Sequence, residues 1–161
     1  ISPDMVALED VSPWMWEWAL AGKSLERWHP RLRYNTTYPL IYPAYSKRNF
    51  YLQMHVSQFC LNKHTVPLNR FMLFRYFLGD SIPRNTVYLA NNNIVRICDE
   101  VWAFGEISNG VLAEIKLKKD QGHIVRYYKI SNGNPISFRK AIGASMPFED
   151  PSLEPYRHLL R

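Results

Sequence analysis

The residues best suited to chemistry form one short run, SNGVLAE, at positions 108–114. The run follows an apolar stretch, 101–104, that predicts a buried strand ended by Gly105. It opens a stretch, 111–119, that predicts a helix ended by Gly122. The free N–H groups and the dipole of a helix N-terminus attract anions, so Ser108 either caps this helix or also donates to an anion. Asn109 and Gly110 belong to the same candidate binding loop, and Gly110 permits a close backbone approach.

Glu114 is the candidate catalytic residue of this run, and its spacing leaves two interpretations open. It lies in the second turn of the predicted helix, and one turn rises only about 5.4 Å, so its carboxylate can reach the mouth of the loop. There it could act as a nucleophile or a general base. The alternative is an exposed Glu114 that pairs with Lys118 at i,i+4, a contact worth about 0.3–0.5 kcal/mol.

A second candidate loop follows the first predicted strand, at residues 38–45. Ser46 and Arg48 lie in a polar turn that could hold a phosphate or a sugar. Tyr42 and Tyr45 are predicted to line the pocket or to stack on a base. Asn91 and Asn92 belong to a triple Asn inside a predicted helix, where Asn is a poor helix former, and we expect them to face the base.

The elements that position these residues alternate between strand and helix. This alternation predicts an α/β fold, with a flavodoxin-like or Rossmann-like, mostly parallel sheet that has helices on both faces. The sequence of residues 71–78 does not distinguish helix from strand. Ligands then lie beyond the carboxyl ends of the strands. The predicted strands are 38–45, 65–68, 101–104 and 124–130, and the predicted helices are 50–62, 84–97 and 111–119, the second with Val87, Leu89, Ala90, Ile94, Val95 and Ile97 inward.

The two ends differ from this pattern. Residues 1–37 form a predicted arm with a helix over 13–21 that is rich in tryptophan. Those tryptophans indicate core packing or a subunit contact, and alternatively a platform for stacking bases. Residues 131–161 are predicted to be an irregular C-terminal extension that packs on the central domain, 38–130.

Composition, net charge and cysteine count limit the classes of protein to which this chain can belong. The 161 residues are 47% apolar and 21% charged, as in an ordinary globular chain, and the net charge of +6 favours anionic partners. Two cysteines, Cys60 and Cys98, are too few for a disulfide framework and are expected to be packed thiols. We expect no metal, no cofactor and no membrane span. A cytoplasmic location is expected because the start shows no secretion signal, and Ile1 suggests a fragment boundary.

The stretch NNNIVRICDEVWAFGEISNGVLAEIKLKKDQGHIVRYYKI, with the earlier YPLIYPAYSKRN, resembles the nucleoside 2-deoxyribosyltransferase superfamily, including its nucleoside 5′-monophosphate N-glycosidase branch. The resemblance covers roughly residues 38–130. It rests on Asp99, the strand at 101–104, and the Ser-x-Gly-x-x-x-Glu pattern at 108–114. It implies a homodimer or larger homo-oligomer with composite sites, and cleavage of an N-glycosidic bond with Glu114 as the nucleophile.

The resemblance also implies a choice between its branches. The transferases typically have Asp at the position of Ser108, which holds the sugar 5′-hydroxyl, whereas the monophosphate hydrolases have Ser, which contacts the 5′-phosphate. A helix N-terminus with Ser favours binding of a phosphate, and Lys47 and Arg48 add positive charge. The sequence therefore favours a nucleoside 5′-monophosphate.

One departure keeps other functions open. The family usually has an Asp that assists the leaving base where this chain has residues 91–93, all Asn, and Asn cannot act as a general acid. The acid could come from Asp99 or Glu106, or the chain could only bind a nucleotide or a nucleotide-derived signal. A nucleic-acid binder that uses the tryptophan-rich arm is the third and least favoured hypothesis.

Overall fold

Residues 27, 29–74 and 81–161 are described by the computed structural model of this chain. The chain divides into two units, residues 1–37 and 38–161. The described part of the first unit contains a 3-10 helix, η3 (Pro30–Arg33), whose first turn is capped by the His29 imidazole, which accepts a hydrogen bond from the Arg31 N–H at 3.0 Å. The helix predicted over 13–21 and its tryptophans lie outside the described residues.

The described part of the second unit is built on a five-stranded sheet with the order β2-β1-β3-β4-β5. β1 pairs in parallel with β2 and β3, and β3 pairs in parallel with β4, whereas β5 is antiparallel to β4. The prediction of an α/β fold with a mostly parallel sheet is therefore confirmed. The strands are β1 (Leu40–Tyr45), β2 (Val66–Pro67), β3 (Glu100–Phe104), β4 (Val125–Ser131) and β5 (Ser137–Ala141).

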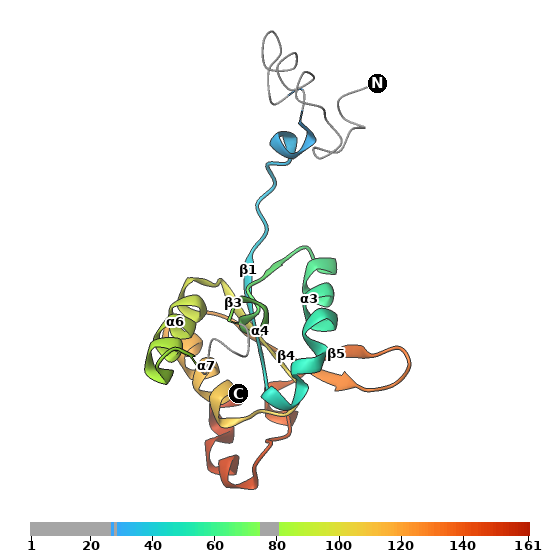
Figure 1. Ribbon diagram of the computed structural model, residues 1–161. Helices are drawn as coiled ribbons and strands as arrows, with labels where there is room; N and C mark the ends of the chain where they lie inside the picture. Colours follow the sequence, from blue (N-terminus) through green and yellow to red (C-terminus); the bar gives the residue numbers. More distant parts are fainter. Residues whose placement is uncertain (1–26, 28, 75–80) are drawn as a thin grey trace. The chain divides into compact units, whose positions relative to one another are not determined.

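Helices cover both faces of this sheet, with α3 on one side and α6 and α7 on the other (Figure 1). The predicted helix 50–62 divides into a 3-10 turn and an α-helix, and the ambiguous segment begins with a short helix whose continuation, 75–80, is outside the described residues. The helical elements are η4 (Lys47–Leu52), α3 (Gln53–Asn62), α4 (Arg70–Leu73), α6 (Arg84–Ile97) and α7 (Asn109–Asp120).

Strand alternation separates two hydrophobic clusters. Successive side chains of a strand point to opposite faces, so Tyr42 and Ala44 of β1 join the cluster beneath α6 and α7. Ile41 and Tyr45 join the cluster beneath α3, where the Phe59 ring stands edge-on to its aromatic neighbours. Because each face of the sheet is covered, consecutive residues of its central strands are buried, as at 41–45 of β1 and 101–104 of β3.

Gly105 ends β3 where the chain must turn out of the sheet. Its φ is +72°, a conformation that side chains with a Cβ rarely adopt. An added Cβ would lie 2.7 Å from Cδ1 of Ile130 and 3.3 Å from Nδ2 of Asn49. The glycine therefore permits both the turn and the close packing of the strand end that leads to α7.

The inward face of α6 differs from the predicted one. Leu89 and Ile97 were expected inside but are 60% and 62% exposed, whereas Asn91 and Val95 are buried. Asn91 can lie on the inner face because two polar side chains from other elements bond to it there. The prediction is therefore confirmed for Val95 and in part for Val87, Ala90 and Ile94, which are half-buried, and it is wrong for Leu89 and Ile97.

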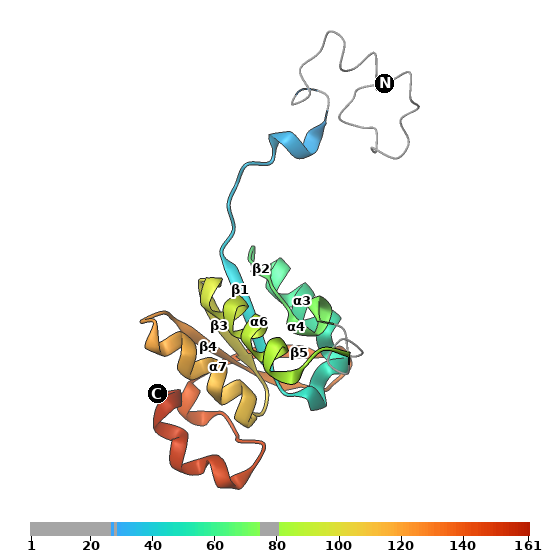
Figure 2. The ribbon, with the colours of Figure 1, turned by 60° about the vertical axis from the view of Figure 1, so that its left-hand side comes forward.

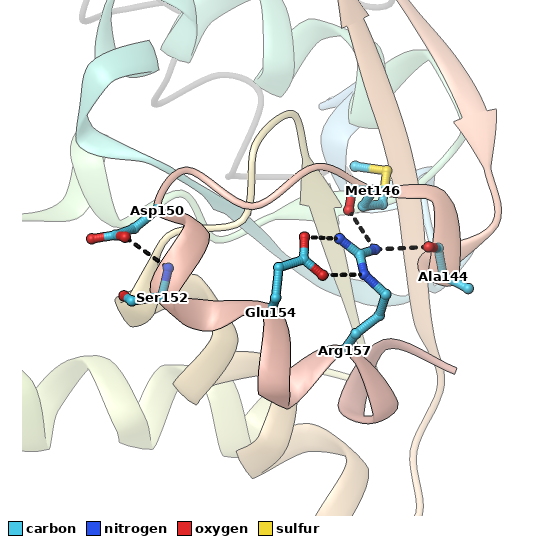
Figure 3. A network of polar contacts seen from close by, with 6 residues as sticks. All are labelled: Ala144, Met146, Asp150, Ser152, Glu154 and Arg157. Atoms are coloured by element: carbon cyan, nitrogen blue, oxygen red, sulfur yellow. Dashed lines mark hydrogen bonds and ion pairs between the residues drawn. The ribbon is translucent and has the colours of Figure 1, made fainter.

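The C-terminal region contains more structure than the sequence indicated. After β5 the chain forms two 3-10 helices, η5 (Gly143–Ser145) and η6 (Pro151–Leu160), and η6 lies beside α7 (Figure 2). Figure 3 shows the Arg157 guanidinium binding both carboxylate oxygens of Glu154 at 2.7 and 2.8 Å, and donating to the carbonyls of Ala144 at 2.7 Å and Met146 at 3.0 Å. These bonds join η5 and η6 into one folded segment.

Candidate active site around Glu114

The Glu114 carboxyl points into the protein and bonds to two other elements. The residue is only 4% exposed, and its position in the second turn of α7 turns it toward β1 and α6. The Tyr42 hydroxyl, from β1, hydrogen-bonds to Oε2 of Glu114. Asn91 Nδ2, from α6, donates to the same oxygen at 2.9 Å, and the Tyr42 hydroxyl lies 2.9 Å from Asn91 Oδ1. Three residues that are far apart in the sequence therefore form one buried polar cluster.

The second carboxyl oxygen of Glu114 has a different environment. Oε1 is buried and has no hydrogen-bond partner among the described residues. A buried polar atom without a partner costs free energy and in a native fold requires an explanation. Oε1 therefore keeps its lone pairs free while Oε2 is held by its neighbours, and it is closed to solvent in this structure.

The alternative in which an exposed Glu114 pairs with Lys118 is wrong. Lys118 is fully buried, and its Nζ donates to the carbonyl of Cys98 at 2.5 Å and to that of Arg96 at 3.4 Å. Its ammonium group thus satisfies carbonyls at the C-terminal end of α6, which have no partner within the helix. Glu114 and Lys118 are both buried, but each bonds to different groups.

The cluster changes the ionisation of its members. Burial is the largest influence on Glu114 and raises its pKa, while the positive charge of Arg70 and the hydrogen bonds of Tyr42 and Asn91 act in the opposite direction. The pKa of Tyr42 is raised well above its ordinary value, first by burial and then by the charge of Glu114. A carboxyl with a raised pKa can exchange a proton nearer to neutral pH than an exposed one.

The N-terminus of α7 borders a separate cavity of about 450 Å³. The Ser108 hydroxyl accepts a hydrogen bond from the Val111 N–H at 3.3 Å, so it caps the helix as predicted. The cavity is lined by Arg48, Ser108, Asn109 and residues 149–153 of the C-terminal region. Glu114 is not among the lining residues, because its side chain is turned toward Tyr42 and Asn91.

Opposite charges meet across this cavity. The Arg48 guanidinium pairs with Glu149 at 2.8 Å, and the other oxygen of Glu149, Oε2, is buried without a partner among the described residues. Asp150 caps η6 by accepting a hydrogen bond from the Ser152 N–H at 2.9 Å (Figure 3). The second candidate loop, which carries Arg48, and the loop before α7 thus border the same cavity, together with Glu149 and Asp150 of the C-terminal region.

The remaining predicted site residues are placed in several ways. Ser46 is buried and caps η4, accepting a bond from the Arg48 N–H at 3.2 Å. The Tyr45 hydroxyl bonds to Asn69 on the opposite face of the sheet from Glu114, since positions 42 and 45 alternate along β1. Asn92 is half-buried, and a Cβ on Gly110 would meet nothing within 4 Å.

Sequence reasoning missed Arg70 and the acidic wall of the cavity. Arg70 acts on both Glu114 and Tyr42 through its charge, but it directly precedes residues 71–78, for which the sequence did not distinguish helix from strand. Glu149 and Asp150 lie in the tail, for which no pattern was found. For Arg70 the sequence offered one signal: the preceding Asn69 is a good helix cap and could have indicated that a helix begins at Arg70.

The rest of the described chain gives few other site candidates. Among residues 27, 29–74 and 81–161, no group of three or more His, Cys, Asp or Glu side chains is placed to hold a metal ion. In the same ranges no helix has both the length and the apolar character needed to cross a membrane. Cys60 and Cys98 are buried free thiols, and burial raises the pKa of each to about 12, which makes them poor nucleophiles.

The fold and the cluster together define an α/β protein with a buried carboxyl group on the helix that follows β3. The family described as a domain of unknown function (DUF7768) matches residues 41–128, more than half of the chain, and the protein therefore belongs to this family. The matched residues include Tyr42, Asn91 and Glu114 but end before the acidic wall at 149–153. No curated protein matches the sequence.

Proposed function

We propose that the protein cleaves the N-glycosidic bond of a nucleoside 5′-monophosphate, with Glu114 as the nucleophile. The observation that supports this function best is the asymmetric carboxyl: Oε2 is held by Tyr42 and Asn91, while the buried Oε1 has no partner in the described part of the chain. In such a reaction Oε1 attacks the anomeric carbon, and the transition state carries positive charge on the sugar, which a nearby carboxyl oxygen stabilises. Because Oε1 is buried and Glu114 does not line the cavity beside Ser108, the proposal requires binding of the substrate to expose the carboxyl to the sugar. The resemblance noted in the sequence supports the same reaction.

The second half of the reaction releases the sugar from the enzyme. Water attacks the sugar ester in a hydrolase, and a second base does so in a deoxyribosyltransferase. We favour hydrolysis of a monophosphate because Arg48, Ser108 and the N-terminus of α7 border one cavity. The homo-oligomer that the resemblance implies remains a prediction. The reaction is tested by measuring release of free base from the 5′-monophosphates and the free nucleosides of the common ribo and deoxyribo series.

The Arg48–Glu149 pair bears on the phosphate. The Arg48 side chain is 70% exposed, and exposed ion pairs are worth only about 0–1 kcal/mol. A doubly charged phosphate can therefore displace Glu149 from the guanidinium. Before that exchange, the negative charges of Glu149 and Asp150 repel an anion that enters the cavity. The cavity should therefore favour substrates whose phosphate binds Arg48 more tightly than Glu149 does.

Two variants, one that removes a positive charge and one that removes a negative charge, test whether this cavity binds the phosphate. Arg48→Gln is expected to lower kcat/KM for a monophosphate about tenfold or more, because a charge-assisted hydrogen bond is worth about 1.5–3 kcal/mol, and to leave kcat/KM for the free nucleoside nearly unchanged. Glu149→Gln is expected to raise kcat/KM for the monophosphate. Lys116→Gln is the matched control, since Lys116 is an exposed cation paired with Asp120 at 2.9 Å on α7. Equal changes for monophosphate and nucleoside would contradict a phosphate site here.

A non-catalytic nucleotide-binding protein is the second candidate. It is favoured by one observation, namely that Asn91, in the zone where a catalytic acid was expected, is an amide bonded to Glu114. Stabilisation of the fold by nucleotides without release of base from any of them would support it.

A further inference from the structure

The three contacts among Tyr42, Asn91 and Glu114 form a closed ring. The Tyr42 hydroxyl contacts Asn91 Oδ1 and Glu114 Oε2, and Asn91 Nδ2 contacts the same Oε2. Each contact is a hydrogen bond only if one hydrogen lies between its two heavy atoms. The ring therefore needs three hydrogens, and the protonation state of its members decides whether they are present.

If all three contacts are hydrogen bonds, counting their hydrogens assigns the protonation state of Glu114. A neutral tyrosine has one hydroxyl hydrogen, and only that hydrogen can fill its contact with the Asn91 carbonyl oxygen. The amide fills its own contact with Oε2. The contact between Tyr42 and Glu114 is then left to a hydrogen on the carboxyl itself. Turning the Asn91 amide round does not change the count, because its oxygen would then face Oε2 and again require the hydrogen of the carboxyl.

The surroundings agree with a protonated Glu114. Burial raises its pKa, and the pKa of Tyr42 is raised too far for a phenolate to take part. Arg70, from α4, opposes this effect through its charge, and hydrogen bonds that Tyr42 and Asn91 donate to an ionised carboxylate oppose it as well. In the ring counted above, Tyr42 instead accepts from the carboxyl, so its bond stabilises the acid and its effect on the pKa of Glu114 is reversed. On α7 itself, Lys118 is turned to backbone carbonyls. From β4 the same core cluster contributes Tyr127, whose pKa burial raises to about 12, so it stays neutral.

The other elements around α7 add little charge at the carboxyl. The inner positions of β3, Val101 and Ala103, are apolar. η6 packs on α7 and carries Glu154 and Arg157, which bond to each other and to η5. Its His158 ring bonds to the Pro155 carbonyl at 3.2 Å and is exposed. Among the described residues, Arg70 is thus the cation whose charge acts on both Glu114 and Tyr42.

We propose that Glu114 enters the reaction as a neutral acid and supplies both the attacking oxygen and the proton that the leaving base requires. This inference rests on the proposed function. Oε1 forms a bond to C1′ of the sugar, while the bond from C1′ to the base nitrogen breaks and its electron pair stays on the base. The hydrogen on Oε2 passes to the base, directly or through the Tyr42 hydroxyl. The products are a sugar ester of Glu114 and the neutral base, so no other acid is needed.

This arrangement gives the triple Asn a chemical explanation. A second carboxylate in place of Asn91 would compete for the same proton, whereas the amide donates to Oε2 and accepts from Tyr42. Asn91 and Tyr42 are then positioning residues, which hold the proton on the oxygen that does not attack. Glu114 itself then supplies the proton that the resemblance assigned to a separate acidic residue.

The first test needs no substrate. The infrared carbonyl band of protonated Glu114 is followed against pH in the empty protein, with Glu114→Gln as the reference that lacks it. We expect a midpoint above the ordinary value of 4.5. Tyr42→Phe should move the midpoint down, because the acid loses the oxygen that accepts its hydrogen. Tyr45→Phe is the matched control on the same strand and should not move it, because its hydroxyl bonds to Asn69 on the other face.

The second test is the pH profile of base release, measured with the monophosphate that the panel shows to react fastest. We expect kcat/KM to fall as pH rises through the carboxyl midpoint, since the acid is the reactive form, and Tyr42→Phe to lower the rate about a hundredfold. A rate that rises with pH through this midpoint would overturn the proposal. So would an ionised Glu114 in the empty protein at pH 4.5, or a midpoint that Tyr42→Phe moves up. If no base is released from any substrate, the proposed function and the catalytic part of this inference both fail. The infrared band then tests separately whether Glu114 is protonated in the ring.

Discussion

Glu114→Gln is expected to reduce release of base from a nucleoside 5′-monophosphate by about a thousandfold or more, because a nucleophile has no substitute within reach. The amide has nearly the shape of the acid and can still bond to Tyr42 and Asn91, so the fold should remain. An amide oxygen cannot form a stable ester with the sugar. The rate is measured by chromatography of the free base, and folding is checked by circular dichroism and thermal unfolding.

Asp120→Asn is the matched control for this variant. It removes a carboxylate from the same helix, but Asp120 is exposed and pairs with the exposed Lys116. Its rate should equal that of the wild-type protein. If Glu114→Gln and Asp120→Asn released base equally fast, Glu114 would have no covalent role.

The second large effect is expected for Gly143→Ala, which should destabilise the fold by about 1–3 kcal/mol or more. An added Cβ would lie 1.9 Å from the Leu160 carbonyl oxygen and 2.6 Å from the Tyr127 ring. Both the backbone of η6 and a buried ring would have to move. Because the first residues of η6, 151–153, themselves line the cavity beside Ser108, that cavity should loosen as well.

Gly110→Ala gives the comparison in the same experiment. A Cβ there meets nothing within 4 Å, and alanine in a helix is favoured over glycine by up to about 1 kcal/mol. Urea unfolding of both variants should therefore show a loss for Gly143→Ala and no loss for Gly110→Ala. Equal free energies of unfolding would mean that η6 does not pack against Gly143 as described.

The part of the fold that could be predicted is the part in which local pattern and burial agree. β3 is an apolar run ended by a glycine, and α7 begins at a serine cap and ends in lysines, so both were found from the sequence. β5 was missed because it has no buried residue and only Phe138 and Ala141 pack against the core. An edge strand of this kind has no hydrophobic alternation to indicate it.

The candidate site was found in part, for a physical reason. Glu114 could be singled out because it lies on a helix that follows a buried strand. Its bonds to Tyr42 and Asn91 span 72 and 23 residues, and no local pattern encodes such contacts. The same long-range bonds bury Asn91 and turn Leu89 outward, which the apolar period of α6 could not indicate. Tyr42 and Tyr45 were grouped by proximity, although strand geometry separates them.

The most direct test of the nucleophile is to capture the sugar on the protein. A nucleotide whose sugar carries fluorine at C2′ in the arabino configuration should slow release of the enzyme-bound sugar, because the fluorine destabilises positive charge on the ring. Mass spectrometry of the digested protein should then show one sugar phosphate added to the peptide that contains Glu114, and no such addition in Glu114→Gln. Release of base with the sugar attached to another residue, or to none, would contradict the account.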